Sequence, residues 1–209
     1  MRRLHRGIAP TCLATFRHGA NNWGDVSTAQ KLEVWVLLNT MQGHRCAYCE
    51  AGIGPSDRHI EHFVQKGRDP RQTFVWSNLF GSCNRDASCG KHKDEKGWPY
   101  SAPDLIKPDI EDPETLLVFE PGGAVRPRSG LLAADARRAA ETIRVFNLNG
   151  VLKAIRGVEL MGYLQTAEEI AEFFGVDPVL GLQYLDEELQ AIAHHPFATA
   201  IKQVLTRQD

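Results

Sequence analysis

The chain has 209 residues, of which 43% are hydrophobic and 24% are charged, and its formal net charge is −2. This composition supports a substantial core and excludes a global cationic field for binding nucleic acid, so phosphate contacts must come from local basic patches or a partner. No apolar run approaches the roughly 20 residues that span a bilayer, and no hydrophobic signal region follows the basic start. We therefore expect a cytosolic protein that contacts no membrane.

Residues 1–45 are expected to form an arm and a helix. Residues 1–26 mix basic residues with glycine and proline and show no sustained period, which favours an ordered arm. Ser27 and Gln30 have the spacing of a capping box, apolar residues follow at helical spacing, and Gly43 supplies a stop. The sequence therefore predicts a helix that ends just before the cysteine-rich part of the chain.

The chain contains 5 cysteines, an odd number that argues against a disulfide framework in a reducing compartment. Two pairs of cysteines suit a structural zinc site, because the ion prefers tetrahedral sulfur ligation and a two-residue gap lets one knuckle supply two ligands. The four predicted zinc ligands are Cys46, Cys49, Cys83 and Cys89. Cys89 and His92 have a spacing that could also complete such a site, whereas Cys12 is expected to be a small buried hydrophobic residue.

A β-hairpin and a helix are expected after the first cysteine pair. Residues 57–64 and the β-branched and aromatic residues 73–76 are predicted strands, joined by a loop that contains glycine and proline. A helix should then begin near Ser77. Two strands followed by a helix is the ββα-metal arrangement of small metal-dependent nucleases.

Side chains in this segment have the chemistry for phosphodiester hydrolysis. A neutral His62 could take a proton from an attacking water, and Glu61 offers a carboxylate oxygen to a Mg²⁺ or Mn²⁺ ion that stabilises charge on the phosphate. Neighbours in an ideal strand point to opposite faces, so both can serve only if the strand ends or bulges there. Asn78 either caps a helix, holds the metal or fixes the loop that carries His62. His59 competes with His62 and is more simply a surface or supporting residue.

Proline is dense between residues 97 and 128, which forbids a helix there and favours an extended connection. Residues 115–119 and 124–125, separated by a glycine-containing turn, are expected to be two strands. We assign residues 46–128 to one core that includes this proline-rich flank and its hairpin.

Residues 129–209 are expected to form a helical subdomain. Apolar residues recur at helical spacing from Leu131 to Phe146, and Asn149 can cap a second helix that reaches Leu164. Further helices are predicted over residues 166–175, from the Asp-Pro pair at 177–178, and over residues 196–206. The expected fold class is α+β, with a ββα-metal core and structural zinc embedded in a mainly helical chain.

The order Glu61-His62, Asn78 and His92, framed by the cysteine pairs, resembles the HNH endonucleases. More narrowly, several stretches are similar to PtuB, the HNH subunit family of Septu anti-phage systems, which also occurs with some retrons. Within the motif these stretches are residues 42–50 (QGHRCAYCE), 59–63 (HIEHF), 76–83 (WSNLFGSC) and 89–93 (CGKHK). Outside it they are residues 1–4 (MRRL), residues 142–149 (TIRVFNLN) and Arg156. The resemblance therefore covers most of the chain.

The resemblance implies a bacterial, cytoplasmic DNA nuclease that acts with an ATPase subunit, PtuA, in a hetero-oligomer. His62 would be the catalytic base. Glu61, Asn78 and His92 would lie on the side of the catalytic ion, although the third position varies within the superfamily. A subunit that its partner delivers to DNA needs no strongly cationic surface, and residues 131–206 are expected to form much of the docking surface for that partner.

Two other functions remain open. A non-catalytic zinc-ribbon adaptor could bind nucleic acid or protein, but it would have no use for Glu61, His62 and Asn78. A thiol redox protein could use the pair Cys46 and Cys49, but the two further cysteines favour metal ligation.

Overall fold

A computed structural model describes residues 1–95 and 99–206, and within these ranges the chain is α+β and mostly helical, with two small antiparallel sheets. The strand β1 (Arg58–His62) pairs with β2 (Leu79–Cys83), and β3 (Leu117–Phe119) pairs with β4 (Val125–Pro127). The helices are α1 (Thr28–Gln42), α2 (Cys89–Glu95), α3 (Ala133–Val145), α4 (Val151–Val176), α5 (Pro178–Ile192) and α6 (Ala198–Leu205).

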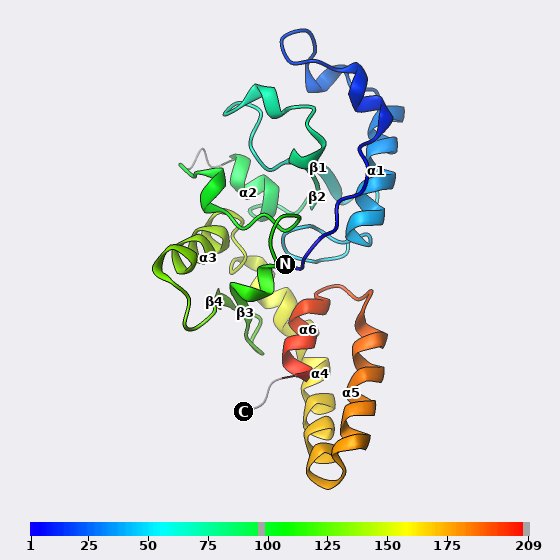
Figure 1. The fold of residues 1–209 in the computed structure, drawn as a ribbon, viewed down its shortest axis with the longest axis vertical. Helices are drawn as coiled ribbons and strands as arrows, with labels where there is room; N and C mark the ends of the chain where they lie inside the picture. Colours follow the sequence, from blue (N-terminus) through cyan, green and yellow to red (C-terminus); the bar gives the residue numbers. More distant parts are fainter. Residues whose placement is uncertain (96–98, 207–209) are drawn as a thin grey trace.

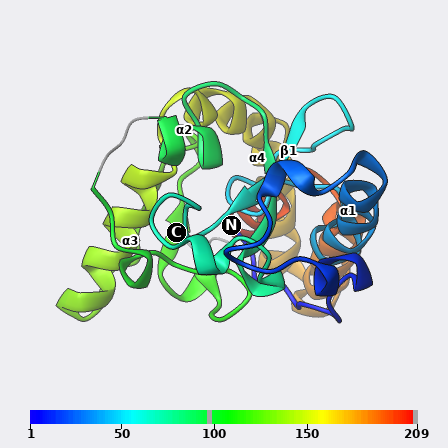
Figure 2. The ribbon, with the colours of Figure 1, turned by 90° about the horizontal axis from the view of Figure 1, so that it is seen from above.

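The molecule consists of a body and a projecting helical hairpin. The body holds α1, α2, α3 and both sheets, and α4 and α5 extend from it side by side (Figure 1). From above, α1 and α3 lie on opposite sides of the body, with β1 and α2 between them (Figure 2). No helix in residues 1–95 or 99–206 is long and apolar enough to cross a bilayer.

The predicted helix after the arm is confirmed as α1. The Ser27 amide donates to Gln30 Oε1 at 2.9 Å, and the Gln30 amide donates to Ser27 Oγ at 3.3 Å, so the capping box is complete. Gly43 ends the helix with a φ of +62°, a left-handed conformation that costs glycine little.

The predicted first strand is confirmed as β1, but the second strand and the helix near Ser77 were placed wrongly. Residues 70–78 contain two short 3₁₀ turns, the strand that pairs with β1 is β2, and the following helix, α2, begins only at Cys89. Contacts with the arm explain the difference: Phe74 stacks on Phe16 at 5.2 Å, and the Trp76 indole donates to the Gly7 carbonyl at 3.1 Å. Tertiary packing therefore overrides the local β propensity of residues 73–76.

Gly81, in the middle of β2, lets α1 lie directly on the strand. A Cβ at this position would be 2.7 Å from the ring of Trp35, so only glycine fits without displacing α1. Gln42 then hydrogen-bonds Gly81 in both directions, donating to its carbonyl at 2.8 Å and accepting from its amide at 2.7 Å. The last turn of α1 is thus fixed to the strand that leads to Cys83.

In the second half, the hairpin of β3 and β4 is confirmed, but two details of the helices differ from the prediction. Asn149 does not cap a helix: its side chain accepts from the Val125 amide and donates to the Val125 carbonyl, both at 2.7 Å. The two helices expected over residues 149–175 are one continuous helix, α4. The capping-box pattern at Thr166 contains no glycine or proline, so α4 passes through it, and the next helix starts at Pro178 as predicted.

Buried side chains from the arm, α1, the β1–β2 sheet and α3 pack in one hydrophobic cluster with residues of α4 and α6. Met1 and Glu50 lie within this packing, and the Met1 ammonium is 2.6 Å from Glu50 Oε1. Glu50 Oε2 also accepts from the amide and hydroxyl of Thr199, next to the start of α6. The first cysteine knuckle is therefore tied to the C-terminal helix.

Candidate metal centre and active site

The four predicted zinc ligands come together in the body. Cys46 and Cys49 lie in the loop after α1, Cys83 ends β2, and Cys89 begins α2. Their four sulfur atoms all lie within 4.8 Å of one another, and those of Cys49 and Cys83 are 4.0 Å apart. A tetrahedral zinc ion with bonds of about 2.3 Å requires sulfur atoms about 3.8 Å apart, so this cluster could hold a metal ion such as zinc.

Backbone hydrogen bonds and left-handed backbone conformations position these cysteines. Cys46 donates its amide to the Ala51 carbonyl at 2.9 Å, and Glu50 adopts a left-handed φ of +65°, which folds the first pair into a tight knuckle. Cys89 has a φ of +51° and donates its amide to the Phe146 carbonyl at 2.9 Å. Glu50 and Cys89 are two of the six residues other than glycine that adopt a positive φ in the described chain, as expected where a site dictates the backbone.

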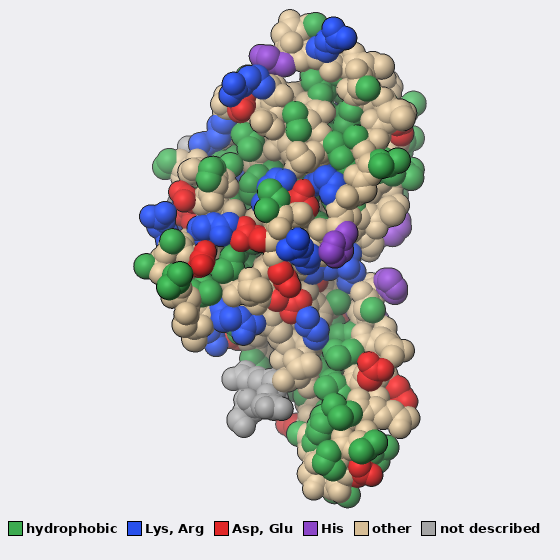
Figure 3. All heavy atoms as spheres, in the orientation of Figure 1, with side chains coloured by type: hydrophobic (Ala, Val, Ile, Leu, Met, Phe, Trp, Pro, Cys, Tyr) green, Lys and Arg blue, Asp and Glu red, His purple; other side chains and the backbone are tan. Residues whose placement is uncertain are grey.

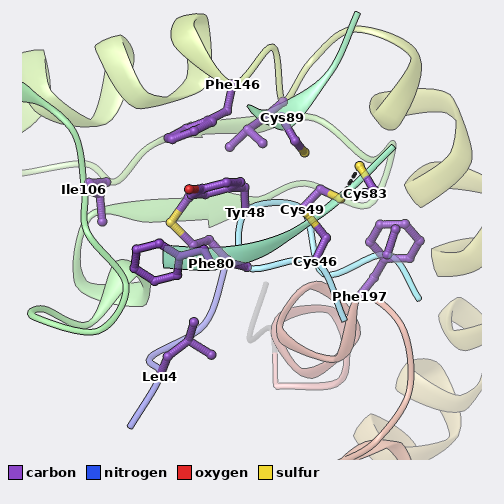
Figure 4. Packing of buried hydrophobic residues seen from close by; sticks show 14 of the residues in the cluster. Leu4, Cys46, Tyr48, Cys49, Phe80, Cys83, Cys89, Ile106, Phe146 and Phe197 are labelled. Carbon is purple, nitrogen blue, oxygen red and sulfur yellow. Dashed lines mark hydrogen bonds between the residues drawn. The ribbon is translucent and has the colours of Figure 1, made fainter. Parts of the chain in front are cut away.

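The cysteine cluster lies in an apolar environment. Tyr48 stacks on Phe146 with ring centroids 4.0 Å apart, and the four cysteines gather between these rings and Phe197 (Figure 4). Burial raises the pKa of the Cys89 thiol well above its ordinary value, so a thiolate there needs a nearby positive charge. An ion bound by all four sulfur atoms would supply that charge. Cys12 lies apart, with its sulfur 3.6 Å from the Gln30 carbonyl, and burial raises its pKa to about 11.

A second cluster surrounds Glu61, which is only 1% exposed. Lys93 of α2 places its ammonium 2.7 Å from Glu61 Oε1 and 2.5 Å from Asp94 Oδ1, and donates to the His62 carbonyl at 3.0 Å. On the other side, His59 Nε2 lies 3.3 Å from Glu61 Oε2. We call Glu61, Lys93, Asp94 and His59 the Glu61 cluster.

The Glu61 cluster contains its own cation, Lys93. Burial alone would raise the pKa of Glu61, but the hydrogen bond from His59 and the charge of Lys93 lower it below its ordinary value. Burial and the neighbouring Glu61 carboxylate raise the pKa of Asp94. Gly90 permits the close approach of α2, because a Cβ there would lie 2.3 Å from Glu61 Oε2. Two oxygen-donor carboxylates therefore face one buried cation.

His62 ends β1 and points to the opposite face from Glu61. Its ring meets Trp23 edge-on at 4.6 Å, and its Nε2 lies 3.0 Å from the Thr73 carbonyl oxygen. Because a carbonyl only accepts, Nε2 carries the proton and Nδ1 keeps its lone pair in the neutral ring. Burial, followed by the charge of Lys66, lowers the pKa of His62 to about 4. The imidazole is therefore neutral at physiological pH.

Asn78 fixes the loop that provides the Thr73 carbonyl. Its amide nitrogen donates to the carbonyls of Val64 at 3.0 Å and Gln72 at 3.1 Å, and its Oδ1 accepts from the Val64 amide at 2.7 Å. These bonds close the loop over residues 64–72 at both ends. Of the roles considered for Asn78, the structure shows loop fixation, whereas β2 rather than a helix follows it.

His92 lies on α2 but turns toward α3, with its Nδ1 2.9 Å from the Val145 carbonyl oxygen. The structure therefore places Glu61 beside His59 and Lys93, while Asn78 and His92 bond to backbone elsewhere. Only one group of three or more His, Cys, Asp or Glu side chains within residues 1–95 and 99–206 lies close enough together to share an ion. That group is the four cysteines.

Four residues of these sites were not predicted from the sequence: Lys93, Asp94, Trp23 and Thr73. One signal was available: His59 and Glu61 are two apart in a strand, a spacing that puts both on one face. The chain matches no protein-family model, and no curated protein is significantly similar to it.

Proposed function

We propose that the chain is a metal-dependent HNH endonuclease of the PtuB type, which cleaves DNA phosphodiester bonds in the bacterial cytoplasm. It would act as the effector subunit of an anti-phage complex with a PtuA-like ATPase. The observation that carries this proposal is the geometry of His62, a neutral imidazole at the end of a hairpin with Nε2 bonded to Thr73. The buried carboxylate of Glu61 directly precedes it.

His62 serves as the general base. With Nε2 held by the Thr73 carbonyl, Nδ1 is the nitrogen that takes the proton from a water attacking the phosphorus atom. Asn78 positions this base indirectly, because it closes the loop that ends at Thr73. The edge-on contact with Trp23 must loosen for water to reach the ring, since His62 is only 2% exposed.

A Mg²⁺ or Mn²⁺ ion would be held at the Glu61 cluster. The carboxylates of Glu61 and Asp94 offer oxygen atoms suited to such an ion, and His59 offers an imidazole. These three side chains do not lie close enough together to share an ion as they stand, so they would have to close around it as it displaced Lys93. Once bound, the ion would stabilise the negative charge that develops on the phosphate and the leaving oxygen. Asn78 and His92, which the resemblance assigns to the metal side, would have to release their backbone partners to reach it.

The distribution of charge supports DNA as the substrate, and the resemblance supports a PtuA-like ATPase as the partner. The loop that Asn78 closes carries Lys66, Arg68 and Arg71, and Lys66 lies near enough to His62 for its charge to lower the pKa of the imidazole. Basic residues in this loop suit a DNA backbone. The cysteine cluster would have a structural role: an ion bound there would hold the β1–β2 sheet to α2.

The test is cleavage of plasmid DNA with Mg²⁺ or Mn²⁺, with the protein encoded next to it added, by the native chain and by His62→Ala. His18→Ala, which removes an exposed histidine of the arm, is the matched control. Loss of a general base costs about 10²- to 10⁴-fold in rate, so we expect that loss in His62→Ala alone, with unchanged zinc content.

Equal cleavage by all three proteins would overturn the assignment of His62. The absence of cleavage by any of them, with zinc bound, would favour the zinc-ribbon adaptor that binds nucleic acid or protein without cutting it.

A further inference from the structure

The projecting hairpin of α4 and α5 presents apolar side chains to solvent. Val176 at the end of α4 is 87% exposed and Val179 at the start of α5 is 75% exposed. Other exposed apolar residues of the two helices are Val158, Met161, Leu164, Phe173, Leu180 and Leu182. Hydrophobic side chains gather at this end of the molecule, with acidic ones among them (Figure 3). An apolar concentration of this kind marks a contact surface rather than scattered exposure.

A groove of about 590 Å³ runs between the two helices on this surface. Its apolar lining includes Phe173 and Tyr184, whose rings meet edge-on with centroids 5.3 Å apart. Its acidic lining consists of Glu169, Glu172 and Glu187. The groove therefore combines an apolar floor with carboxylates.

Hydrogen bonds and packing within the chain hold the tip of the hairpin, and the groove is already formed in the free chain. Asp177 accepts hydrogen bonds from the amides of Val179 at 2.9 Å and Leu180 at 3.3 Å, which caps α5. Gly181 is buried against Phe174, where a Cβ would lie 2.8 Å from the ring. A preformed groove lowers the entropic cost of binding.

Charge is divided sharply between residues 157–201, which hold most of α4 and all of α5, and the rest of the chain, which includes Lys153 and Arg156 in the first turns of α4. All 24 lysines and arginines lie outside residues 157–201, whereas eight of the 26 acidic residues lie within that segment. The segment therefore carries a formal charge of −8, and the remainder carries +6. This field repels nucleic acid, an anionic membrane and the same face of a second copy, and it attracts cations.

We propose that this groove binds a cationic amphipathic helix of a partner protein. The apolar residues of that helix, spaced three and four apart, would pack on Phe173, Val176 and Leu180. Its flanking lysines and arginines would pair with Glu169, Glu172 and Glu187. This is helix-in-groove recognition with charge complementarity at the rim. The site shares no residue with the cysteine cluster, the Glu61 cluster or His62, so its failure would leave the nuclease proposal intact.

The experiment titrates three labelled helical peptides with the full chain at physiological salt, by fluorescence anisotropy. The first combines a leucine face with lysines, the second keeps the lysines but replaces leucine by serine, and the third keeps leucine but replaces lysine by glutamate. We expect the leucine–lysine peptide to bind at least about 10-fold more tightly than either comparator, because binding requires both features.

Variants then locate the site. Glu172→Lys with Glu187→Lys, and separately Val176→Ser with Leu180→Ser, should each weaken binding about 10-fold or more. Asp86→Lys with Glu120→Lys makes the same charge change on the body and should alter binding less than about 2-fold. Circular dichroism confirms that each variant folds, which is expected because Val176 and Leu180 are exposed.

Several outcomes would overturn the proposal: no binding of the leucine–lysine peptide, equal binding of the lysine–serine peptide, or an equal loss in the body variant. Self-association of the native chain that Val176→Ser with Leu180→Ser abolishes would overturn it too, because a second copy would then cover the groove.

Discussion

The cysteine cluster and the Glu61 cluster share one helix, α2, but balance charge in opposite ways. Cys89 begins α2 and meets three other buried cysteines, four like groups with no basic side chain among them. Lys93, one turn further along, places a buried ammonium between Glu61 and Asp94. The first cluster gathers potential anions, whereas the second already contains its own cation.

This difference would make an ion at the four cysteines permanent and an ion at the Glu61 cluster exchangeable. The buried Arg156 interacts with Cys49 and Cys89, but one guanidinium cannot balance four thiolates, so the body and a bound ion would form as a unit. The Glu61 cluster already holds the Lys93 ammonium against its carboxylates, so we expect it to fold without an ion. An ion that bound there would have to displace Lys93, which favours weak and reversible binding.

Removal of one cysteine should have the largest effect. Cys83→Ser takes one ligand from a cluster whose four sulfur atoms lie within 4.8 Å of one another. Structural zinc contributes about 10–16 kcal/mol in small zinc domains, as much as the whole stability of a typical domain. We expect the variant to lose its metal and to unfold in the body, measured by metal analysis and thermal unfolding.

Cys12→Ser is the matched control, since this sulfur lies apart from the cluster, 3.6 Å from the Gln30 carbonyl oxygen and close to Glu33. It should keep about one metal ion per chain. Native metal content and melting temperature in Cys83→Ser would show that the cysteines are ordinary core residues and would remove the contrast between the two clusters.

Lys93→Met should have the next largest effect, because it leaves the charge of Glu61 buried without its partner. Breaking a buried ion pair from one side costs about 3–5 kcal/mol, and the Lys93 side chain is 0% exposed. We expect a decrease of this size in the free energy of unfolding, measured with urea. Added Mn²⁺ should restore part of it, because the ion would replace the missing cation.

Lys91→Met tests the same chemical change at a less buried position. Lys91 pairs with Asp86, whose side chain is 91% exposed, so the loss should be about 1 kcal/mol or less. If the two variants were equally stable, or if Mn²⁺ raised the stability of both equally, the Glu61 cluster would not be the exchangeable site.

The cysteine cluster was predictable because its signal is local. The two-residue gap between Cys46 and Cys49 specifies a knuckle. In the same way, the cap residues Ser27 and Gly43 directly flank α1 and predicted where it begins and ends. Such short-range chemistry is largely independent of the rest of the fold.

The Glu61 cluster was only half predictable because it depends on distant packing. Strand alternation places His59 with Glu61, but Lys93 reaches them only through the approach of α2 that Gly90 allows. The second strand was misplaced for the same reason. Gly81 lowers the local β propensity of β2, and a glycine is required there because the Trp35 ring packs against it. Neither contact leaves a pattern in the sequence.

The smallest effect concerns His62, which lies on the other face of β1 and should make stability depend on pH. Its pKa in the folded chain, about 4, is below the ordinary value of 6.5. A histidine whose pKa is depressed by folding contributes stability that is fully present above 6.5 and is lost as pH falls toward 4, because the unfolded chain binds the proton first. Between pH 7 and pH 5 this loss amounts to about 2 kcal/mol.

His62→Gln isolates this contribution, because glutamine can still donate to the Thr73 carbonyl but does not titrate. We expect the free energy of unfolding of the native chain to fall about 2 kcal/mol more between pH 7 and pH 5 than that of His62→Gln. His18→Gln should behave like the native chain.

Trp23→Ala sharpens the comparison: removal of the ring at 4.6 Å exposes His62, so its pKa should rise and the pH dependence should shrink. Identical slopes in the native chain and His62→Gln would mean that His62 is already open to water, and the arm would then not cover the base.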